Sequence, residues 1–504
     1  MYSKALTKLS VTASAFTRKK AAQDLLDLVT PLLGVKTQQR PGSLPPSPPL
    51  PPSTTDHEKI LKAMRHLARS LIPGHPLHTI FHDGEIHDPL GGGSYAFQND
   101  IAGPVLRALL RDEYVSGKAA IAHDADTETK ISNDRLPHHP IVIHAGLQPN
   151  NSPHVGTLVV FCYAFAFARA LRDRMAKVAE KGDVLPSVTV LITFVDTAPV
   201  KDQGVQIDGV QYQKSHRDIP EAFWRYMSDY KEVLQFLSTW SGIPVTEAFQ
   251  SDLFSNPAMP SLVEYMVAQR GVLGPQLSPK YSVLALRSAC PVPGCGLAEK
   301  HGRFNEYVDK KCGKALSAAI RFRCPHHSPH TIRLSDPTEV ARLEANAPTR
   351  NLLRGMTHLL DTSVHHIRVT GSDYAGMYQE TFLYRPLAAW SAATGQACGR
   401  TPHILYAPLI VDWSGAKLSK SLYVREDAYT IMEQLGMDGF CSYAQLRDRF
   451  DRDGGRGLRK IWDEVDSWVA DPRKLFRTFS LAYMQGVVFK ENDHDHGHDY
   501  HHQP

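Results

Sequence analysis

The sequence has no hydrophobic run long enough to cross a membrane. A spanning helix needs about 20 consecutive apolar residues, whereas the most apolar stretch of this 504-residue chain, Leu158–Ala168, has only 11. We therefore expect no membrane-spanning segment and no membrane partner. The sequence also contains no internal repeat, which excludes a solenoid or a propeller.

The sequence also lacks a large excess of positive or negative charge. The 56 Lys and Arg residues nearly balance the 52 Asp and Glu residues, which leaves a net charge of +4 at pH 7. A charge this small, spread over the whole chain, does not indicate a nucleic-acid binder by bulk electrostatics. If RNA binds, a local patch must bind it.

Cysteine is scarce and unevenly placed. The chain has seven, an odd number, and four of them lie between Cys290 and Cys324. This pattern favours an intracellular metal site over a disulfide framework, so we expect a cytoplasmic protein.

The first 23 residues contain five Lys or Arg and no Asp or Glu, which is also the composition of a mitochondrial transit peptide. A solvated basic helix and a leader to the mitochondrial matrix both stay open.

The order of apolar segments predicts an α/β fold with a doubly wound parallel sheet. The run IVIHAG from Ile141 indicates a buried strand, the long segment from His154 to Met175 a helix, and VTVLITFVD from Val188 a second strand. Strand, helix and strand in this order form the unit of a doubly wound fold, whose ligands lie beyond the carboxyl ends of the strands.

The segment HAGLQPNNSPHVGT, from His144 to Thr157, predicts a nucleotide site. It joins a strand end, including His144 and Gly146, to a turn and then to His-Val-Gly-Thr at a helix start. Phosphate groups are stabilised at a helix N-terminus by free N–H groups, and Gly156 permits a close approach. His154 can donate to a phosphate oxygen. The competing interpretation is that His154 only caps the helix.

A second candidate segment for nucleotide binding follows an apolar run late in the chain, and this one is rich in lysine. Lys417-Leu-Ser-Lys-Ser421 comes after ILYAPLIVDW and a small-residue loop. Two lysines, Lys417 and Lys420, with the hydroxyl residues Ser419 and Ser421, can hold a pyrophosphate leaving group. On its own such a loop is usually just solvated, but it is informative as the second of an ordered pair.

These two segments resemble the HIGH and KMSKS signatures of class I aminoacyl-tRNA synthetases. The resemblance covers residues 138 to 425 and implies a Rossmann-like catalytic domain that activates an amino acid with ATP, as its Mg²⁺ complex. It assigns ATP contacts to His154 and Gly156 and transition-state stabilisation to Lys420, with Lys417 assisting. Thr157 stands where the family usually has a second His. The stretch around His154 looks most like the class I lysyl enzymes, which implies lysine as substrate and tRNA as acceptor.

Further residues are candidates for the adenosine and amino-acid sites. The segment VTGSDYAGMYQET from Val369 combines a strand end, Gly371 and Asp373 with a helix start, and it looks like the family's loop ahead of KMSKS. Asp196, at the end of the second expected strand, is a weaker candidate for binding the substrate amine. An N-capping role without a ligand is the alternative for the Ser-Asp pair.

The cysteine cluster predicts a structural zinc site. Four thiolates suit tetrahedral Zn²⁺, and nearby glycines allow the loops to close. His326 or His327 is an alternative for one of the ligands, and unligated buried thiols are the competing interpretation. The expected ligands are Cys290, Cys295, Cys312 and Cys324.

The expected organisation places the zinc insert between two halves of the catalytic domain. The His-rich tail is expected to be disordered. Only 83 residues follow Ser421, which leaves room for one short helical module in place of a large anticodon-binding domain. The expected parts are 1–53 (basic helix and Pro-rich linker), 54–137 (helical extension), 138–285 and 333–425 (catalytic halves), 286–332 (insert), 426–490 (helical module) and 491–504 (tail).

Three functions remain open from the sequence. The leading one is amino-acid adenylation with transfer to a tRNA 3′ end, through the acceptor stem. A second keeps the adenylate but passes the acyl group to a non-tRNA amine or thiol. A third is an inactive RNA-binding paralogue, which the intact His154, Gly156, Lys417 and Lys420 argue against. A nucleotidyltransferase is disfavoured by the insert and the length.

Overall fold

The computed structural model describes residues 100–117, 136–308, 318–394, 403–412, 415, 417, 432, 434–450 and 455–489. The expected Pro-rich linker, the helix after Ser53 and the His-rich tail lie outside these residues. So do four candidate site residues, namely Cys312, Ser419, Lys420 and Ser421.

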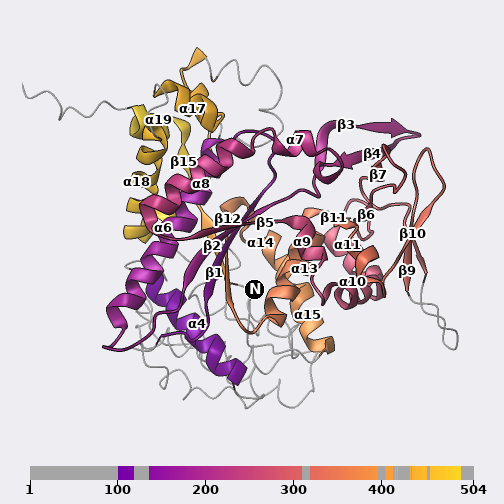
Figure 1. Ribbon diagram of the computed structural model, residues 1–504, viewed down its shortest axis with the longest axis horizontal. Coiled ribbons are helices and arrows are strands. Elements are labelled where there is room, and N and C mark those ends of the chain that lie inside the picture. The colour runs from indigo at the N-terminus through magenta and orange to yellow at the C-terminus, as the bar shows by residue number, and fades with distance from the viewer. Residues whose placement is uncertain are drawn as a thin grey trace, which may run out of the picture.

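The centre of the fold is a five-stranded sheet in the order β13-β12-β1-β2-β5 (Figure 1). All four of its strand pairings are parallel, as the near-continuous apolar runs predict for strands covered on both faces. The strands are β1 (Ile141–Leu147), β2 (Val188–Phe194), β5 (Val245–Phe249), β12 (His365–Gly371) and β13 (His403–Ala407). The predicted strands at Ile141 and Val188 and the helix between them are confirmed.

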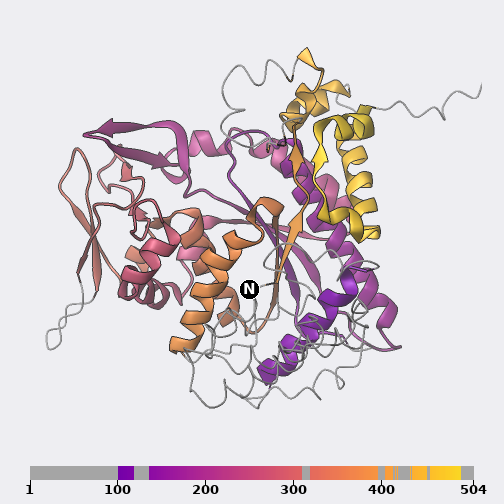
Figure 2. The same cartoon turned by 180° about the vertical axis from the view of Figure 1, so that it is seen from behind.

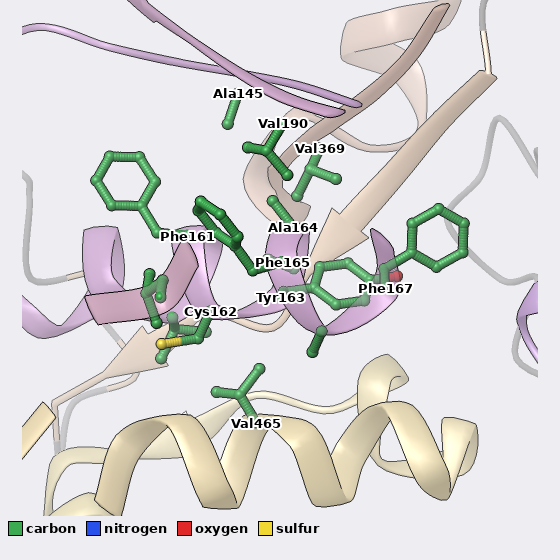
Figure 3. Close-up of a cluster of buried hydrophobic side chains, with 14 of the residues drawn as sticks. Ala145, Phe161, Cys162, Tyr163, Ala164, Phe165, Phe167, Val190, Val369 and Val465 are labelled. Atoms are coloured by element: carbon green, nitrogen blue, oxygen red, sulfur yellow. The ribbon is translucent and has the colours of Figure 1, made fainter. Parts of the chain in front are cut away.

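Helix α6 (Val155–Val178) covers one face of this sheet and is buried on several sides. It is the one described helix that is long and apolar enough to cross a membrane, and 67% of its most apolar window is buried inside the protein. Figure 3 shows Ala145, Val190 and Val369 of three neighbouring strands above α6, with Val465 approaching from below. Burial in the core therefore accounts for its apolar sequence.

The helices around α6 share its hydrophobic core. α4 (Ala102–Gly117), α8 (Met227–Ser241), α17 (Tyr443–Arg449), α18 (Arg456–Ala470) and α19 (Leu481–Phe489) contribute to one continuous cluster with the sheet. In α18, Ile461, Trp462, Val465 and Trp468 are buried at helical spacing, and this helix packs directly on α6. The segment of the expected C-terminal module is helical where it is described, and its helices pack into the cluster around α6 and the sheet.

The opposite face of the sheet is covered by a second set of helices and a second hydrophobic cluster (Figures 1 and 2). Among the helices of this half is α13 (Ala347–Leu360), which begins after Asn346, whose side chain accepts a hydrogen bond from the Thr349 N–H. The others are α9 (Gln250–Phe254), α10 (Met259–Ala268), α11 (Arg270–Leu277), α12 (Pro337–Val340), α14 (Met377–Gln379) and α15 (Arg385–Thr394). Helix α7 (Pro220–Trp224) instead buries Phe223 in the cluster around α6.

Small sheets flank the main one, and one of them includes a strand of the expected insert. β3 (Pro199–Ile207) and β4 (Val210–Ser215) form a hairpin that the sequence analysis did not predict, and it pairs with β7 (Ala298–Glu299) of the insert. The hairpin projects beside the insert in Figure 1. The insert thus has a partner far upstream of residue 286. The remaining strands are β6 (Leu286–Ser288), β8 (Glu306–Val308), β9 (Ala319–Phe322), β10 (His330–Arg333), β11 (Leu343–Ala345), β14 (Ile410–Val411) and β15 (Phe479–Ser480).

Candidate active site

The candidate site lies at the carboxyl ends of β1 and β12. From β1 the chain passes through α6 to β2 on one side, and it returns much later to β12 on the other side. A reversal of this kind is a topological switch point, where open α/β sheets bind their ligands. The two signature segments follow this geometry: the first starts α6 directly after β1, and the second follows β13 and β14.

His154 is the N-cap residue of α6. Its Nδ1 accepts a hydrogen bond from the Gly156 N–H at 3.1 Å, and its Nε2 lies 3.2 Å from Thr157 Oγ1. Since Nδ1 accepts, the neutral ring carries its proton on Nε2. Burial first, and then the charge of Lys417, lowers the pKa of His154 to about 4. His154 is therefore both a helix cap and a neutral donor at physiological pH.

Gly156 is needed for the position of the His154 ring. A Cβ at this position would lie 3.0 Å from His154 Cε1 and 3.1 Å from His154 Nδ1. Contacts of this length are tighter than nearly all Cβ contacts in proteins, so the ring would have to shift. The sequence argument assigned Gly156 to a close approach of the nucleotide, and the structure adds a steric reason within the chain itself.

Lys417 joins the second signature to the loop after β12. Its Nζ donates to Asp373 Oδ2 at 2.9 Å and lies 5.9 Å from the centre of the Tyr374 ring. A Cβ on Gly371 would lie 2.6 Å from Asp373 Oδ1 and 3.7 Å from Lys417 Nζ, so Gly371 leaves room for this ion pair. Lys417 also lowers the pKa of His154 through its charge, so this lysine of the second segment acts electrostatically on the first.

A cavity of about 110 Å³ lies beside this group, over the carboxyl ends of β1, β2 and β12. A water molecule needs only about 10–15 Å³ of such a volume, so the cavity has room for a small ligand. Of the predicted residues, His144 and Gly146 line it. A Cβ on Gly146 would make ordinary contacts, at 3.6 Å from Thr193 O and 3.7 Å from Arg354 Nη1.

Three arginines that the sequence analysis did not single out also line this cavity. They are Arg350 and Arg354 on α13 and Arg368 on β12. A signal was present: Arg350, Arg354 and His358 recur every four residues, which places them on one face of a helix. Likewise His366 and Arg368 are two residues apart and share one face of a strand, opposite the buried Ile367 and Val369.

His144 belongs to a group of three histidines behind the arginines. Its Nε2 lies 2.9 Å from His366 Nδ1, and the His358 and His366 rings stack with their centres 4.2 Å apart. Asp361 Oδ2 lies 3.0 Å from His366 Nε2. Burial first, and then the neighbouring positive groups, lowers the pKa of both His144 and His358 well below 6.5. The ring nitrogens are close enough to hold a metal ion, but the adjacent guanidinium groups disfavour a cation there.

Asp196 is occupied by contacts within the chain. Its Oδ1 accepts the Ser251 N–H at 2.9 Å, and its Oδ2 accepts the Ser251 hydroxyl at 2.6 Å. The carboxylate therefore fixes the start of α9, next to the cavity. A role in binding the substrate amine stays a prediction for Asp196.

The cysteine cluster is built from two loops that meet. Cys290 and Cys295 lie between β6 and β7, while Cys324 and His327 lie between β9 and β10. Gly294 and Gly296, with φ of 80° and 62°, supply the left-handed backbone of the first loop. The ligand atoms of these four residues all lie within 4.8 Å of one another. Of the two histidines considered, His327 is the one in the cluster.

The distances within the cluster fit a tetrahedral zinc ion. Cys295 Sγ and Cys324 Sγ are 3.6 Å apart, and His327 Nδ1 lies 3.5 Å from the Sγ atoms of both Cys290 and Cys324. Bonds of about 2.3 Å to sulfur and about 2.0 Å to nitrogen give tetrahedral edges of about 3.8 and 3.5 Å. The sulfur separation is too long for a disulfide. Burial raises the pKa of the Cys290 thiol to about 12, so a bound cation must displace that proton.

Comparisons with known proteins do not assign the chain to a family. No family model matches the sequence, and no curated protein matches it.

Solved structures show a distant likeness to tRNA synthetases. The glutamate-tRNA synthetase from Elizabethkingia anophelis is 10% identical, over 57% of this chain and 54% of that one, with a TM-score of 0.24. A glutamate tRNA ligase from Elizabethkingia meningosepticum, in complex with its amino acid, is 10% identical over 57% and 53%, with a TM-score of 0.25. A protein described as an arginyl-tRNA synthetase from Campylobacter jejuni is 8% identical over 76% and 89%, with a TM-score of 0.25.

The present chain thus matches about half the length of the two glutamate enzymes. A likeness at these identities and TM-scores assigns neither an activity nor a substrate to the chain.

Proposed function

We propose that the protein activates an amino acid with ATP, forms an aminoacyl-adenylate and transfers the aminoacyl group to the 3′ end of a tRNA. The observation that supports this most is the position of two residues at the switch point of the sheet. His154 caps α6 directly after β1, and Lys417 pairs with Asp373 directly after β12, although the two are more than 260 positions apart in the sequence. Both suit the binding of a polyphosphate.

The residues divide the chemistry between them. The amino-acid carboxylate attacks the α-phosphorus of ATP, the bond to the β-phosphate oxygen breaks, and pyrophosphate leaves. The N-terminal end of α6 stabilises phosphate charge through its free N–H groups. The Nε2–H group of His154 donates one hydrogen bond, and Lys417 supplies a cation that can exchange Asp373 for a phosphate oxygen.

The second step regenerates the site. A hydroxyl group at the tRNA 3′ end attacks the carbonyl carbon of the adenylate, the bond to the phosphate oxygen breaks, and AMP leaves. Mg²⁺ enters bound to ATP and supplies charge neutralisation for the phosphates. The zinc group, where Cys290, Cys295, Cys324 and His327 fit the ion, has a structural role in this proposal, since it ties two loops of the insert together.

The acceptor and the amino acid rest on weaker support. The short helical segment after residue 442 packs on the catalytic core, so tRNA contact would centre on the acceptor stem. Transfer to a non-tRNA amine or thiol uses the same adenylate and remains the second candidate. Lysine is implied by the resemblance alone, and nothing in the comparisons supports it.

Amino-acid-dependent ATP–pyrophosphate exchange, measured with each of the twenty amino acids and with or without tRNA, tests the proposal. We expect exchange with one amino acid and, in a parallel assay, attachment of that amino acid to tRNA. Exchange without tRNA charging would favour the non-tRNA ligase. No exchange under any of these conditions would overturn both enzymatic functions and leave the RNA-binding paralogue.

Lys420→Ala is expected to lower the adenylation rate by at least about a hundredfold, the usual cost of losing a transition-state donor. Lys420 is outside the described residues, so this prediction rests on the signature. Lys181→Ala is the control, because Lys181 is exposed in the turn after α6. An unchanged rate in Lys420→Ala would show that the second signature does not act on the phosphates.

A further inference from the structure

The cavity beside the candidate active site is unusually rich in fixed positive charge. Arg350, Arg354 and Arg368 reach it from two different elements, α13 and β12. Guanidinium groups stay protonated in proteins, so the cavity holds their charges at every physiological pH. Burial lowers the pKa of all three, and for Arg354 the charges of Arg368 and Arg350 lower it further. The protein thus holds like charges together at a cost.

One nearby carboxylate, Asp196, favours the charged form of Arg350, but it lies outside the cavity lining. No Asp or Glu is among the described residues that line the cavity. Asp196 is hydrogen-bonded to Ser251, Asp361 to His366, and Asp373 to Lys417. Each of these three carboxylates therefore has a hydrogen-bond partner that does not line the cavity.

The guanidinium groups also retain donors for a ligand. Arg368 Nη1 is buried without a hydrogen-bond partner. Arg350 Nη1 donates to the Ala345 carbonyl at 3.3 Å and Arg354 Nη2 to the Gln250 side chain, which fixes the two side chains. A buried donor without a partner is rare and costly, and it indicates a missing acceptor. The phenol rings of Tyr374 and Tyr378 complete the wall.

We propose that this cavity binds the side-chain carboxylate of an acidic amino acid, so that the substrate is aspartate, glutamate or a close analogue. This inference rests on the proposed adenylation and names its substrate class. Arg354 and Arg368 pair with the side-chain carboxylate, and the α-carboxylate extends toward His154 and Lys417, where ATP reacts. Arginine binds a carboxylate with two parallel N–H donors, which gives direction as well as charge. The ammonium group of a lysine side chain finds no carboxylate among the described lining residues.

Two other anionic groups could pair with the same arginines, and kinetic measurements on an Arg354 variant distinguish them from a side-chain carboxylate. An ATP phosphate in the cavity would make Arg354 a determinant of the KM for ATP. An α-carboxylate in the cavity would make Arg354 equally important for every amino acid. A side-chain carboxylate instead makes Arg354 important for the acidic substrates alone.

The experiment compares matched amino acids in ATP–pyrophosphate exchange. We expect glutamate or aspartate to exceed its own amide, glutamine or asparagine, by at least about a hundredfold in kcat/KM, because a site built around charged partners rejects the uncharged analogue strongly. Arg354→Gln should raise the KM for the acidic amino acid at least about tenfold and leave the KM for ATP near its wild-type value. Arg459→Gln, an exposed arginine on α18, is the control. Fastest exchange with lysine or a neutral amino acid overturns the proposal, as does a change in the KM for ATP alone.

A direct binding measurement separates this inference from the proposed function. Calorimetric titration of the purified protein with glutamate and aspartate, and with glutamine and asparagine, does not depend on turnover. If no amino acid supports exchange but an acidic one binds the wild type and not Arg354→Gln, the adenylation proposal fails and the carboxylate site stands. If neither acid binds, the carboxylate site is overturned. Arg368→Lys, which keeps the charge and loses the two-pronged geometry, provides a second variant should Arg354→Gln not fold.

Discussion

His154 shows how one residue can satisfy two interpretations at once. From the sequence, a helix cap and a phosphate donor were competing roles, and the cap was the simpler one. In the structure Nδ1 accepts the Gly156 N–H, which leaves Nε2–H for a ligand or for Thr157. Capping fixes the tautomer and orientation that a donor requires. The two roles therefore support each other.

Gly156→Ala should disturb the His154 ring while the helix is retained. The added Cβ would lie 3.0 Å from the ring, and misplacing a reacting group by about 1 Å can cost up to about a hundredfold in rate. We expect the exchange rate to fall at least about tenfold, with the melting temperature nearly unchanged. Gly271→Ala in α11 is the matched control, because nothing lies within 4 Å of its added Cβ. Equal exchange rates in the two variants would contradict this role of Gly156.

The buried histidines predict that stability falls in mild acid. The pKa of His144 and of His358 is well below 6.5 in the folded state, first because of burial, whereas the unfolded chain titrates near 6.5. As the pH drops below about 6.5, the unfolded state gains protons that the folded state does not, so the free energy of unfolding decreases. Each such histidine lowers the free energy of unfolding by at most about 1.4 kcal/mol for each pH unit below that point.

Urea denaturation at pH 7.5, 6.5 and 5.5 measures this effect. His358→Gln should make the dependence of unfolding free energy on pH shallower, while His138→Gln, at an exposed position, should leave it as in the wild type. Constant stability between pH 7.5 and 5.5 would show that these histidines are not held neutral.

The residues proposed to contact phosphate could be singled out from the sequence, whereas the three arginines that line the cavity were missed. A phosphate site of this kind uses short contiguous segments, because one helix start or one loop can supply most of its contacts. The cavity instead joins α13 to β12, and neither segment alone has a distinctive motif. The local signals were the four-residue spacing of Arg350, Arg354 and His358 and the two-residue spacing of His366 and Arg368. Asp196 was singled out from the sequence because it follows a strand. Its position in the sequence did not reveal that its carboxylate is hydrogen-bonded to Ser251.

At the scale of elements, the metal site depends on two loops, one between β6 and β7 and one between β9 and β10, rather than on one stretch of sequence. The expected set of four cysteines came from spacing, but the structure brings His327 beside Cys290 and Cys324. Cys312 lies outside the described residues. Loop geometry decides such a ligand set, and two adjacent histidines cannot be distinguished by sequence position alone.

We expect the purified protein to carry about one zinc ion per chain, measured by elemental analysis. His327→Ala should lose most of the zinc, because it removes one of four ligands, and chelation should lower the melting temperature of the wild type. His326→Ala is the matched control, since its neighbour is the one in the cluster. Equal zinc loss in the two histidine variants would contradict the ligand set, and so would loss in Cys312→Ser with full occupancy in His327→Ala.

For the whole molecule, the sheet and α6 followed from the sequence because their periodicity and apolar runs are strong and local. The hairpin β3–β4 was missed, since its strands are polar and its pairing with β7 spans more than 80 residues. The C-terminal helices were predicted as helices, but their packing on α6 depends on buried faces that meet only in the fold. These long-range contacts join the hairpin to the insert and the C-terminal helices to the helix α6.

The central claim is that residues from both signatures act on one ATP molecule. The most direct measurement is amino-acid-dependent ATP–pyrophosphate exchange by the wild type, His154→Ala, Lys417→Ala and the double variant. We predict that each single substitution lowers the rate by about a hundredfold or more, and that the double variant is far less impaired than the product of the two effects, since residues that act as a unit are not additive. A wild-type rate in either single variant, or no exchange by the wild type, would contradict the claim.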